Sequence, residues 1–577
     1  MSSFPRVYLS LSLSIMLGSW QVLNHHQPQS NGMRMRPLRL LGAFYAASVI
    51  IWTETIITTG ATSSSSSWST DDNLLSTSSN LPPRACVPPH DKYPFCNMSL
   101  SLSDRVDDLI DRLTLEEKPF LLTARESPRG NISRLGIPEY DWGANCMHGV
   151  QSRCTKEGRC ATSFPNPNAL GATFNSSLWH DIGHIIGLEL RALWLQNVGE
   201  NHDSNLPHLG LDCWSPNIGI VRDPRWGRAL ESPGEDPHIN SVYGIQYTRG
   251  LQNNSHLDGR YLQACSTLKH FVANSLEGID HVLEPTRHSV NAIISLYDLA
   301  STYLIPFRNT VEKAGAAGIM CSYNRVNGVP MCANEFLLSL TLRHQWKFRG
   351  YITSDSGAID DFSMFHNYTK YKNESVALAL DAGCDVESAS WPRNHPWSTG
   401  GNYIKFVAEL VKSGRLSEGA LDRALRNALE IRFRLGLFDP IEHQPFWKIS
   451  PSVVQSSDHV HTAKEATAQG MVLLKNNADR LLPLDGRSKI ALLGPHVFDR
   501  HVMLGNYLGE TCFRDKTNRC VTSFEEGFQR LSNENNGSVK SAQGCEVFGN
   551  DTSHFHEAID IAKDMDVVIF FGGLNLT

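Results

Sequence analysis

The feature that most constrains the fold is a regular alternation of short apolar runs with amphipathic helical segments over roughly three hundred residues. Short apolar runs are typical of buried parallel strands, and the intervening helices cover the faces of the sheet. At this length a (β/α)8 TIM-like barrel fits best, and no long internal repeat points to a solenoid or a propeller. The sequence therefore predicts an α/β fold with such a barrel over residues 91–437. The alternating segments are 179–198, 211–217, 264–268, 290–311, 317–320, 335–346, 351–354 and 376–382.

A second α/β region is expected after a proline-containing linker at residues 438–459. Residues 460–475 have a helical pattern, and two apolar runs at 489–493 and 567–571 predict strands that are each followed by glycine. Because the sequence ends soon after the second of these strands, we expect residues 460–577 to form an incomplete α/β sandwich.

The N-terminal region has the pattern of a secretory signal. A basic segment begins at Met33, an apolar run follows at 40–52, and small residues come after it. The apolar run is shorter than the ~20 residues that span a bilayer, which favours a cleaved signal peptide over a signal anchor for residues 1–61. The internal position of the signal indicates that Met33 or Met35 is the true start and that a gene-model extension precedes it. Residues 62–90 are predicted to be a low-complexity linker.

Glycosylation sequons and cysteines also indicate a secreted protein. The cysteines do not have the paired spacings that hold zinc, so no metal is expected. Their number, 13, is odd and implies a free thiol or a missing partner. Close spacing predicts local disulfides within the group Cys146, Cys154 and Cys160, between Cys321 and Cys332, and between Cys512 and Cys520. The sequons lie at Asn97, Asn131, Asn175, Asn253, Asn367, Asn373, Asn536, Asn550 and Asn575.

Net charge limits the class of partner. A net charge of −7 is small for 577 residues and gives no electrostatic reason to expect nucleic acid or an anionic membrane surface. A neutral or weakly charged substrate fits better.

The stretch at residues 349–360 is the strongest candidate for the chemistry. Its apolar part, residues 351–353, favours a strand, and a small, turn-forming segment then leaves the Asp355 carboxylate at the strand's end. In an α/β barrel this end of the strands carries the active site. The alternative is that Asp355 only caps the helix that follows.

Other predicted strand ends also carry polar side chains. The loop 222–237 is dense in arginine and acidic residues, and we expect either an ion-pair network that holds one guanidinium toward a cleft or a solvated loop. Lys269 and His270 follow a predicted strand directly and could donate to substrate hydroxyls or to a carboxylate. Arg287 and Tyr323 could donate in the same way. For each of these four residues, the alternative is an ordinary position on the surface or in the core.

The order of these segments resembles glycoside hydrolase family 3, and within it the β-xylosidase branch typical of plants and fungi. The resemblance covers about residue 94 to the end. It rests on the ordered motifs Trp-Ser-Pro-Asn at 214–217, the loop 222–237, Lys269-His270, Met-Cys-Ser-Tyr-Asn at 320–324, and Gly-Tyr-Ile-Thr-Ser-Asp at 350–355. Leu-Leu-Lys-Asn at 473–476 and Gly-Asn-Tyr-Leu-Gly at 505–509 resemble the branch's second domain.

The resemblance implies a retaining exo-glycosidase that needs no cofactor and acts on xylo-oligosaccharides. A nucleophilic carboxylate would form a glycosyl ester, and a second carboxyl about 5 to 5.5 Å away would protonate the leaving oxygen and then activate water. Asp355 falls on the family's nucleophile, and Tyr323 falls on a tyrosine beside it. The positions that bind hydroxyls of the terminal sugar correspond to Arg228, Lys269, His270 and Arg287.

Three departures from the family's pattern affect what the resemblance implies. Asn145 stands where the xylosidase branch has a glutamate that touches the sugar, so the preference for xylose over glucose or arabinose is less well defined. Ser356 stands where many β-glucosidases have tryptophan, which disfavours glucose. The acid/base glutamate follows a strand that resembles residues 567–575, so we expect this glutamate and the rest of the sandwich to lie beyond Thr577.

Two classes of function follow. The leading one is an extracellular exo-β-xylosidase, with a β-glucosidase or an α-L-arabinofuranosidase as alternatives in the same class. An N-acetylhexosaminidase is disfavoured, because residues 271–275 lack the histidine-containing loop of such enzymes. The other class is a non-catalytic carbohydrate-binding protein that lacks the acid/base. Contact with a membrane is expected only if the N-terminal signal is retained.

Overall fold

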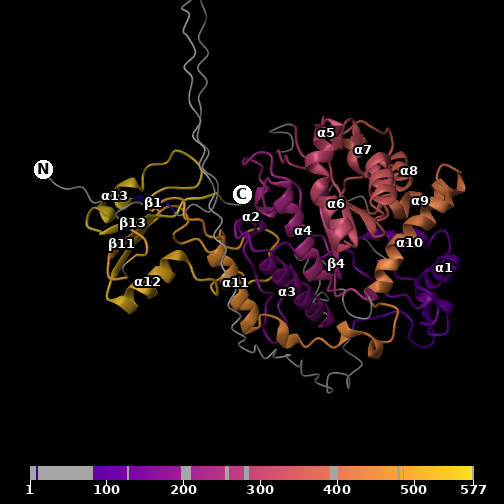
Figure 1. Cartoon of the computed structure of the whole chain (residues 1–577), viewed down its shortest axis with the longest axis horizontal. Helices are drawn as coiled ribbons and strands as arrows, with labels where there is room; N and C mark the ends of the chain where they lie inside the picture. The colour runs from indigo at the N-terminus through magenta and orange to yellow at the C-terminus, as the bar shows by residue number, and fades with distance from the viewer. Residues whose placement is uncertain are drawn as a thin grey trace, which may run out of the picture. The chain divides into compact units, whose positions relative to one another are not determined.

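The computed structural model (Figure 1) describes residues 8–10, 82–125, 129–196, 209–253, 259–278, 285–389, 400–476, 481–484 and 486–574. Apart from a short strand, the predicted signal region at 1–61 lies outside these residues, as do most of the linker predicted at 62–90 and the sequon at Asn575. Within the described ranges, no helix is both long and apolar enough to cross a membrane.

A series of parallel strands forms the centre of the larger domain, which is TIM-barrel-like as the sequence predicts. Backbone pairing runs from Ala144 through β3 to β4, β6 and β9, and then by way of Val386 and β10 to β2. Because all these pairs are parallel, the C-terminal ends of the strands lie together at one end. The bounds are β2 Thr123–Ala124, β3 Asp212–Cys213, β4 Cys265–Phe271, β6 Gly318–Cys321, β9 Tyr351–Ser354 and β10 Glu387–Ser388.

Helices surround these strands, as Figure 1 shows for α3, α4, α6, α8, α9 and α10. Close helix packing needs small residues: a Cβ on Gly183 of α3 would lie 2.4 Å from the carbonyl oxygen of Tyr247 in α4. The bounds are α1 Leu102–Arg112, α2 Pro167–Gly171, α3 Ser176–Leu195, α4 Pro237–Gln252, α6 Ile305–Ala314, α7 Asp361–Met364, α8 Lys372–Ala382, α9 Asn402–Lys412 and α10 Glu418–Arg434.

Two predicted segments of the barrel differ from the structure. Strand β4 does not end at residue 268 but continues to Phe271, because it pairs with β6 on one side as far as that residue, so Lys269 and His270 lie within the strand. The segment 290–311 is not continuous. Its first residues form β5 Asn291–Ala292, which pairs with β7 Arg325–Val326, a tertiary contact that local periodicity does not encode. After it come α5 Leu296–Asp298, a π-helix at Leu299–Tyr303 and α6, and β7 continues into β8 Val329–Pro330.

The second domain is an α/β layer, as predicted. A parallel sheet has the order β1–β13–β11–β12, and apolar residues of β11 and β13 form two small cores on its faces. The helix predicted at 460–475 begins earlier and ends at Gly470, since glycine is a poor helix former and the following residues are extended. The bounds are α11 Ser457–Gly470, β11 Lys489–Leu493, α12 Phe524–Asn535, β12 Ser538–Ala542, α13 Phe555–Lys563, β13 Val567–Phe570 and β1 Tyr8–Ser10.

The structure confirms one local disulfide in each of the three predicted groups and places Cys146 outside its group. Cys154–Cys160, Cys321–Cys332 and Cys512–Cys520 are bonded, but Cys146 pairs with Cys213, across 67 residues. Local spacing cannot reveal a bridge between a loop and a strand that lies far along the chain. A fifth disulfide joins Cys86 and Cys96, and the thiols of Cys265, Cys384 and Cys545 are free. The one cysteine group in the described residues with the spacing of a metal site includes Cys321 and Cys332, whose sulfurs are already bonded to each other.

Candidate functional site

Asp355 lies directly after β9, at the C-terminal end of the strands. Its backbone N–H donates to the carbonyl of Cys321 on the neighbouring strand, at 3.1 Å, which fixes the start of the turn. Its two carboxylate oxygens have different surroundings. Oδ1 accepts hydrogen bonds from the Tyr323 hydroxyl at 3.0 Å and from the Ser356 N–H at 2.7 Å. Oδ2 lies 3.5 Å from Nε2 of His270 and has no hydrogen-bond partner among the described residues. One oxygen is therefore held and the other is available.

Tyr323 and Arg287 form one side of the site. The guanidinium of Arg287 lies 4.9 Å from the centre of the Tyr323 ring and pairs with Glu277 at 2.8 Å. Burial and the neighbouring Asp355 carboxylate raise the pKa of Tyr323 well above its usual value, so its hydroxyl keeps its proton and donates. Burial alone would lower the pKa of Arg287, but Tyr323, Glu277 and Asp355 raise it overall.

Arg228 and His270 form the other side. The Arg228 guanidinium makes a two-pronged ion pair with Glu231, at 2.8 and 2.9 Å, and its Nη2 lies 3.0 Å from Nε2 of His270. This confirms the ion pair expected in the loop 222–237. Burial, together with the positive charges of Arg228, Lys269 and Arg287, lowers the pKa of His270 well below its usual value. His270 is therefore neutral near pH 7 and can offer a neutral ring N–H.

The second domain contributes Tyr507 to the same cluster. Its hydroxyl lies 2.8 Å from Nη2 of Arg228, and the ammonium of Lys269 lies 4.3 Å from the centre of its ring. The neighbouring Asn506 donates to Glu231 at 2.8 Å, and its carbonyl lies 2.6 Å from Nε2 of His148. Sequence analysis placed Tyr507 in a family motif but did not assign it to the site. The motif at 505–509 was the only available signal.

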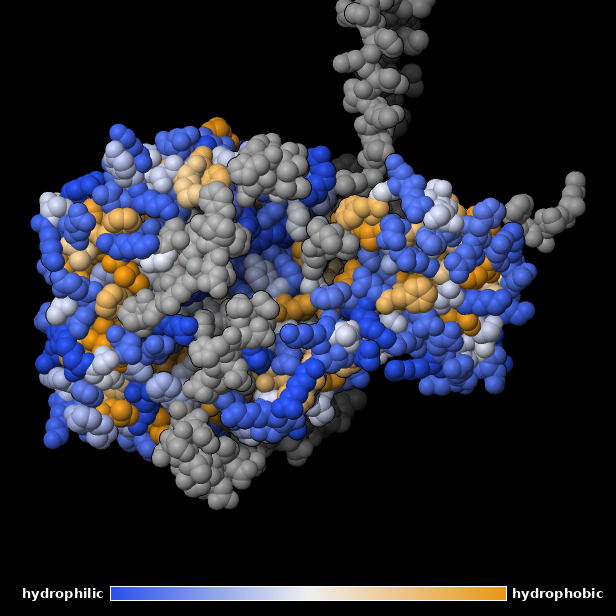
Figure 2. Space-filling model, turned by 180° about the vertical axis from the view of Figure 1, so that it is seen from behind, coloured by the Kyte–Doolittle hydropathy of each residue, from blue (hydrophilic) through white to orange (hydrophobic). Residues whose placement is uncertain are grey.

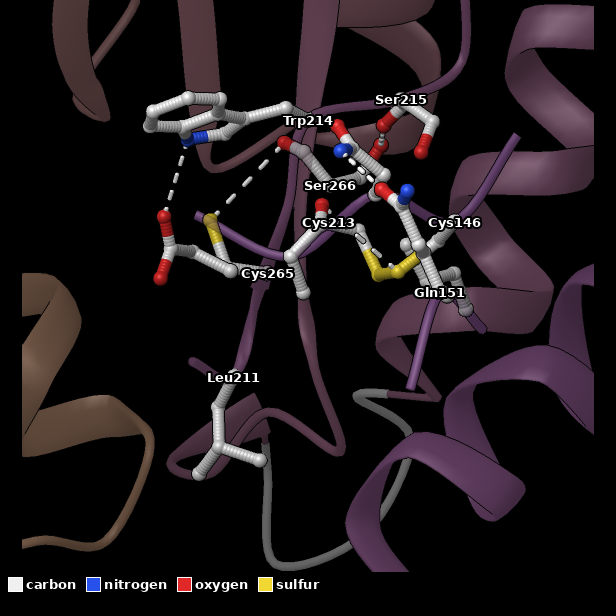
Figure 3. Close-up of a disulfide and its surroundings, with 12 residues drawn as sticks. Cys146, Gln151, Leu211, Cys213, Trp214, Ser215, Cys265 and Ser266 are labelled. Carbon is white, nitrogen blue, oxygen red and sulfur yellow. Dashed lines mark hydrogen bonds between the residues drawn. A yellow bond between two sulfur atoms is a disulfide. The ribbon is translucent and has the colours of Figure 1, made fainter. Parts of the chain in front are cut away.

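Asn145 lies in the loop after Ala144, beside the Cys146–Cys213 disulfide shown in Figure 3. Its side-chain amide donates to Gln151 at 2.5 Å, and in the described part of the chain no hydrogen bond joins it to Asp355. The disulfide fixes this loop against the end of β3. Among the described residues, Asn145 is thus the one predicted site residue that these contacts do not connect with Asp355, either directly or through another residue of the cluster.

Asp212 organises the adjoining part of the barrel. This fully buried carboxylate accepts hydrogen bonds from the hydroxyls of Tyr140 and Tyr351, at 2.8 and 3.0 Å. It also accepts from the Gly143 N–H at 2.8 Å and from the indole N–H of Trp214 at 3.1 Å. Burial raises the pKa of Asp212 to about 7, although its hydrogen bonds oppose the shift. Asp212 therefore sets the orientation of the Trp214 ring.

Stability should depend on the protonation of Asp212. Its folded pKa of about 7 lies above the ordinary 3.8, so between these values the folded state keeps a proton that the unfolded state loses. Raising the pH through this window therefore favours unfolding. Asn does not titrate, so the difference in unfolding free energy between wild type and Asp212→Asn should fall as the pH rises. Urea denaturation at about pH 4.5 and about pH 7.5 measures it. A pH-independent difference would contradict the raised pKa.

Arg125, which follows β2, is a site residue that sequence analysis missed. Its guanidinium stacks 4.4 Å from the centre of the Trp214 ring, and Nη1 donates to the hydroxyl of Ser356 at 3.1 Å. The side chain is exposed, yet surrounding protein atoms lower the pKa of Arg125 by desolvation. Both observations fit a side chain at the entrance of the site, where part of the guanidinium faces solvent and protein atoms surround its other side. Its only sequence signal was a cation directly after a short apolar run.

Together these residues bring one available carboxylate oxygen, neutral donors and several cations to the C-terminal ends of parallel strands. Such a set can hold a polyhydroxylated ligand by hydrogen bonds and attack an electrophilic carbon with a carboxylate. In retaining glycosidases, a carboxylate acts as the nucleophile in this way.

Comparison with known proteins agrees with this chemistry. A probable beta-D-xylosidase 7 of Arabidopsis thaliana is 39% identical over 513 residues, which are 86% of this chain and 62% of that protein. A probable exo-1,4-beta-xylosidase of Aspergillus fumigatus is 36% identical, covering 87% of this chain and 61% of that one. The chain thus spans about three-fifths of the length of these curated relatives.

A solved structure is similar over the same extent. It is an exo-beta-xylosidase in complex with a xylobiose aziridine activity-based probe, with a TM-score of 0.74 and 30% identity. The match covers 86% of this chain and 60% of that one. Residues 122–431 match the glycosyl hydrolase family 3 N terminal domain, and residues 471–576 match the C-terminal domain of the same family. The fold, the relatives and both domain matches agree, and the chain belongs to glycosyl hydrolase family 3.

Proposed function

We propose that this protein is a retaining, exo-acting β-D-xylosidase that hydrolyses xylo-oligosaccharides from xylan. The observation that carries the proposal is the asymmetry of Asp355: Oδ1 is held by two donors, and Oδ2 has no hydrogen-bond partner among the described residues. Support also comes from relatives named β-D-xylosidase at 36 to 39% identity. We propose residues 91–437 as the catalytic barrel domain, 438–459 as a linker and 460–577 as part of the sandwich.

In the proposed reaction, Oδ2 of Asp355 attacks the anomeric carbon of the terminal sugar. The bond from that carbon to the leaving oxygen breaks, and a glycosyl ester on Asp355 forms. Tyr323 and the Ser356 N–H hold Oδ1 and keep the attacking oxygen aimed. Water then cleaves the ester and releases a sugar of unchanged anomeric configuration.

The surrounding donors are assigned to the sugar. Arg228, Lys269, His270 and Arg287 would bind its hydroxyls through their N–H groups. Asn145 is proposed as a further hydroxyl contact from the neighbouring loop. The scheme also needs a second carboxyl group to protonate the leaving oxygen, and we assign this role to none of the described residues.

Secretion is proposed with the enzyme function. Disulfides form and persist in oxidising compartments, and the described part of the chain holds five of them. An extracellular location would also place the enzyme with cell-wall oligosaccharides.

Parallel assays with an aryl β-xyloside, an aryl β-glucoside and an aryl α-L-arabinofuranoside test the sugar assignment. We expect the xyloside to have the highest kcat/KM, because Ser356 leaves no aromatic platform beside the nucleophile. A higher value for another sugar would transfer the assignment to that sugar. Binding of xylo-oligosaccharides without hydrolysis of any aryl glycoside, including one with a leaving group that needs no proton, would favour a carbohydrate-binding protein instead.

A further inference from the structure

The substituent on C5 of the sugar is the feature that the hydroxyl-binding residues cannot select. β-D-Xylose, β-D-glucose and β-D-glucuronic acid have the same arrangement of ring hydroxyls, and they carry a hydrogen, a hydroxymethyl and a carboxylate at C5, respectively. Discrimination among them therefore depends on the side chain that faces C5. This inference rests on the proposed function, since it concerns the sugar held against Asp355.

The order of the strands places Arg125 on the other side of Asp355 from Tyr323, Lys269 and His270. Going one way from β9, the pairing reaches β6 and then β4, which carry or precede Tyr323, Lys269 and His270. Going the other way, it reaches β10 and then β2, which Arg125 follows. A pyranose that offers its hydroxyl edge to the first side presents its C5 edge toward the second.

Arg125 also differs from the other two arginines of the site in its charge balance. Arg228 is paired with Glu231 and Arg287 with Glu277, each at 2.8 Å. Within the described residues, Arg125 has no acidic partner at ion-pair distance, and its one side-chain hydrogen bond goes to the neutral hydroxyl of Ser356. A guanidinium has five N–H donors, so several remain available for a ligand.

The position of Arg125 is held firmly enough to recognise a ligand. Its guanidinium carbon lies over the Trp214 ring, 4.4 Å from the ring's centre, and Trp214 is itself held by Asp212. A Cβ on Gly143 would lie 2.6 Å from the Trp214 ring, so this glycine permits the ring's position. The backbone of Arg125 is left-handed, with φ of 66°, a conformation that costs energy for a non-glycine residue and is concentrated at functional sites.

We propose that Arg125 binds a carboxylate on C5 of the terminal sugar, so that the site also accepts β-D-glucuronides. Arginine and a carboxylate form charge-assisted, two-pronged hydrogen bonds. The pair would neutralise the sugar's charge beside Asp355, whose own carboxylate would otherwise repel it. The chemical step is unchanged, because the carboxylate at C5 takes no part in bond breaking.

Covalent labelling of Asp355 provides the test. The chain is incubated with 2-deoxy-2-fluoro-β-D-glucuronyl fluoride or with the corresponding β-D-xylosyl fluoride. In each case Oδ2 forms an ester bond to the anomeric carbon and fluoride leaves with the bonding electrons, so no proton donor is needed. The rate of labelling is followed by intact mass, and the labelled residue is identified by peptide mapping.

We expect both reagents to label Asp355 in the wild type. Arg125→Gln should slow labelling by the glucuronyl reagent on the order of 10- to 100-fold more than labelling by the xylosyl reagent, because only the glucuronyl sugar carries a charged partner for the arginine. Arg125→Lys keeps the positive charge but loses the paired N–H donors of the guanidinium, so it should give an intermediate rate of labelling by the glucuronyl reagent. Arg308→Gln is the matched control, because Arg308 is an exposed arginine on α6 whose side chain is 60% accessible.

The outcomes separate this inference from the proposed function. If the xylosyl reagent labels the wild type and the glucuronyl reagent does not, the role of Arg125 is overturned and the xylosidase proposal stands. Equal slowing of both reagents in Arg125→Gln would show that the arginine only supports Trp214 and Ser356, and would also overturn it. Labelling by neither reagent would overturn both proposals. Labelling of Asp355 by the xylosyl reagent in Arg125→Gln also shows that the variant is folded.

Discussion

Replacing Asp355 by alanine should lower kcat/KM for an aryl β-xyloside by about 10⁴-fold, the scale of loss when a central catalytic group is removed. The reason is that Oδ2 lies beside His270 and has no hydrogen-bond partner among the described residues, so it is available for attack. The substrate for this measurement should be 2,4-dinitrophenyl β-D-xyloside, whose leaving group departs without a proton. The rate then reports attack by Asp355 and not protonation by another residue.

Two further observations make this prediction specific. Azide is small enough to enter the space left by the carboxylate, and it should restore turnover of Asp355→Ala by forming an α-xylosyl azide of inverted configuration. Asp111→Asn is the control, because Asp111 is exposed on α1. Its activity should match the wild type. Full activity of Asp355→Ala without azide would remove Asp355 from the nucleophile role.

Removing the Cys146–Cys213 disulfide, by changing both residues to alanine, should lower the free energy of unfolding by about 4 kcal/mol. The bridge closes 67 residues, and it restricts the unfolded chain more than a short loop does. The same change should reduce activity, because the bridge fixes the Asn145 loop beside β3 and Trp214 (Figure 3). Urea denaturation without reductant measures the stability, and kcat/KM on the xyloside measures the effect on the site.

The Cys154–Cys160 disulfide provides the matched comparison. It spans 6 residues, so its removal by the same substitutions should cost only about 2 kcal/mol in the chain-entropy estimate. The difference between the two double variants isolates loop length, since both remove one bridge from the same domain. A larger loss from the short bridge would mean that native-state contacts and not chain entropy determine the contribution.

The surface shown in Figure 2 is mainly hydrophilic, with hydrophobic side chains in small groups among the polar ones. One consecutive run, Met471 to Leu474, is exposed after α11, with accessibilities from 55 to 73%. Single exposed apolar residues are ordinary, but a run of four in extended chain can pair with another strand. If a variant aggregates, adding a charged substitution on this run tests whether the run causes the aggregation.

The parallel α/β architecture and the position of Asp355 could be predicted from the sequence because both are local. An apolar run followed by an amphipathic helix defines a buried strand and its crossover, and β9, β6 and β11 lie where these runs predict them. Boundaries were less accurate where tertiary pairing extends or divides a segment. β4 reaches Phe271 because β6 pairs with it, and β5 forms because β7 lies alongside.

By itself, the sequence determined the barrel, the following α/β layer, the family and a carboxylate at a strand end. Only the tertiary structure decided which charges meet there. Arg228 has Glu231, Arg287 has Glu277, and Arg125 has no acidic partner among the described residues, although all three are arginines near strand ends. Tyr507 reaches Arg228 from 279 residues away. Local periodicity carries no information on such contacts, because they depend on how the strands pair and on which loops that pairing brings together.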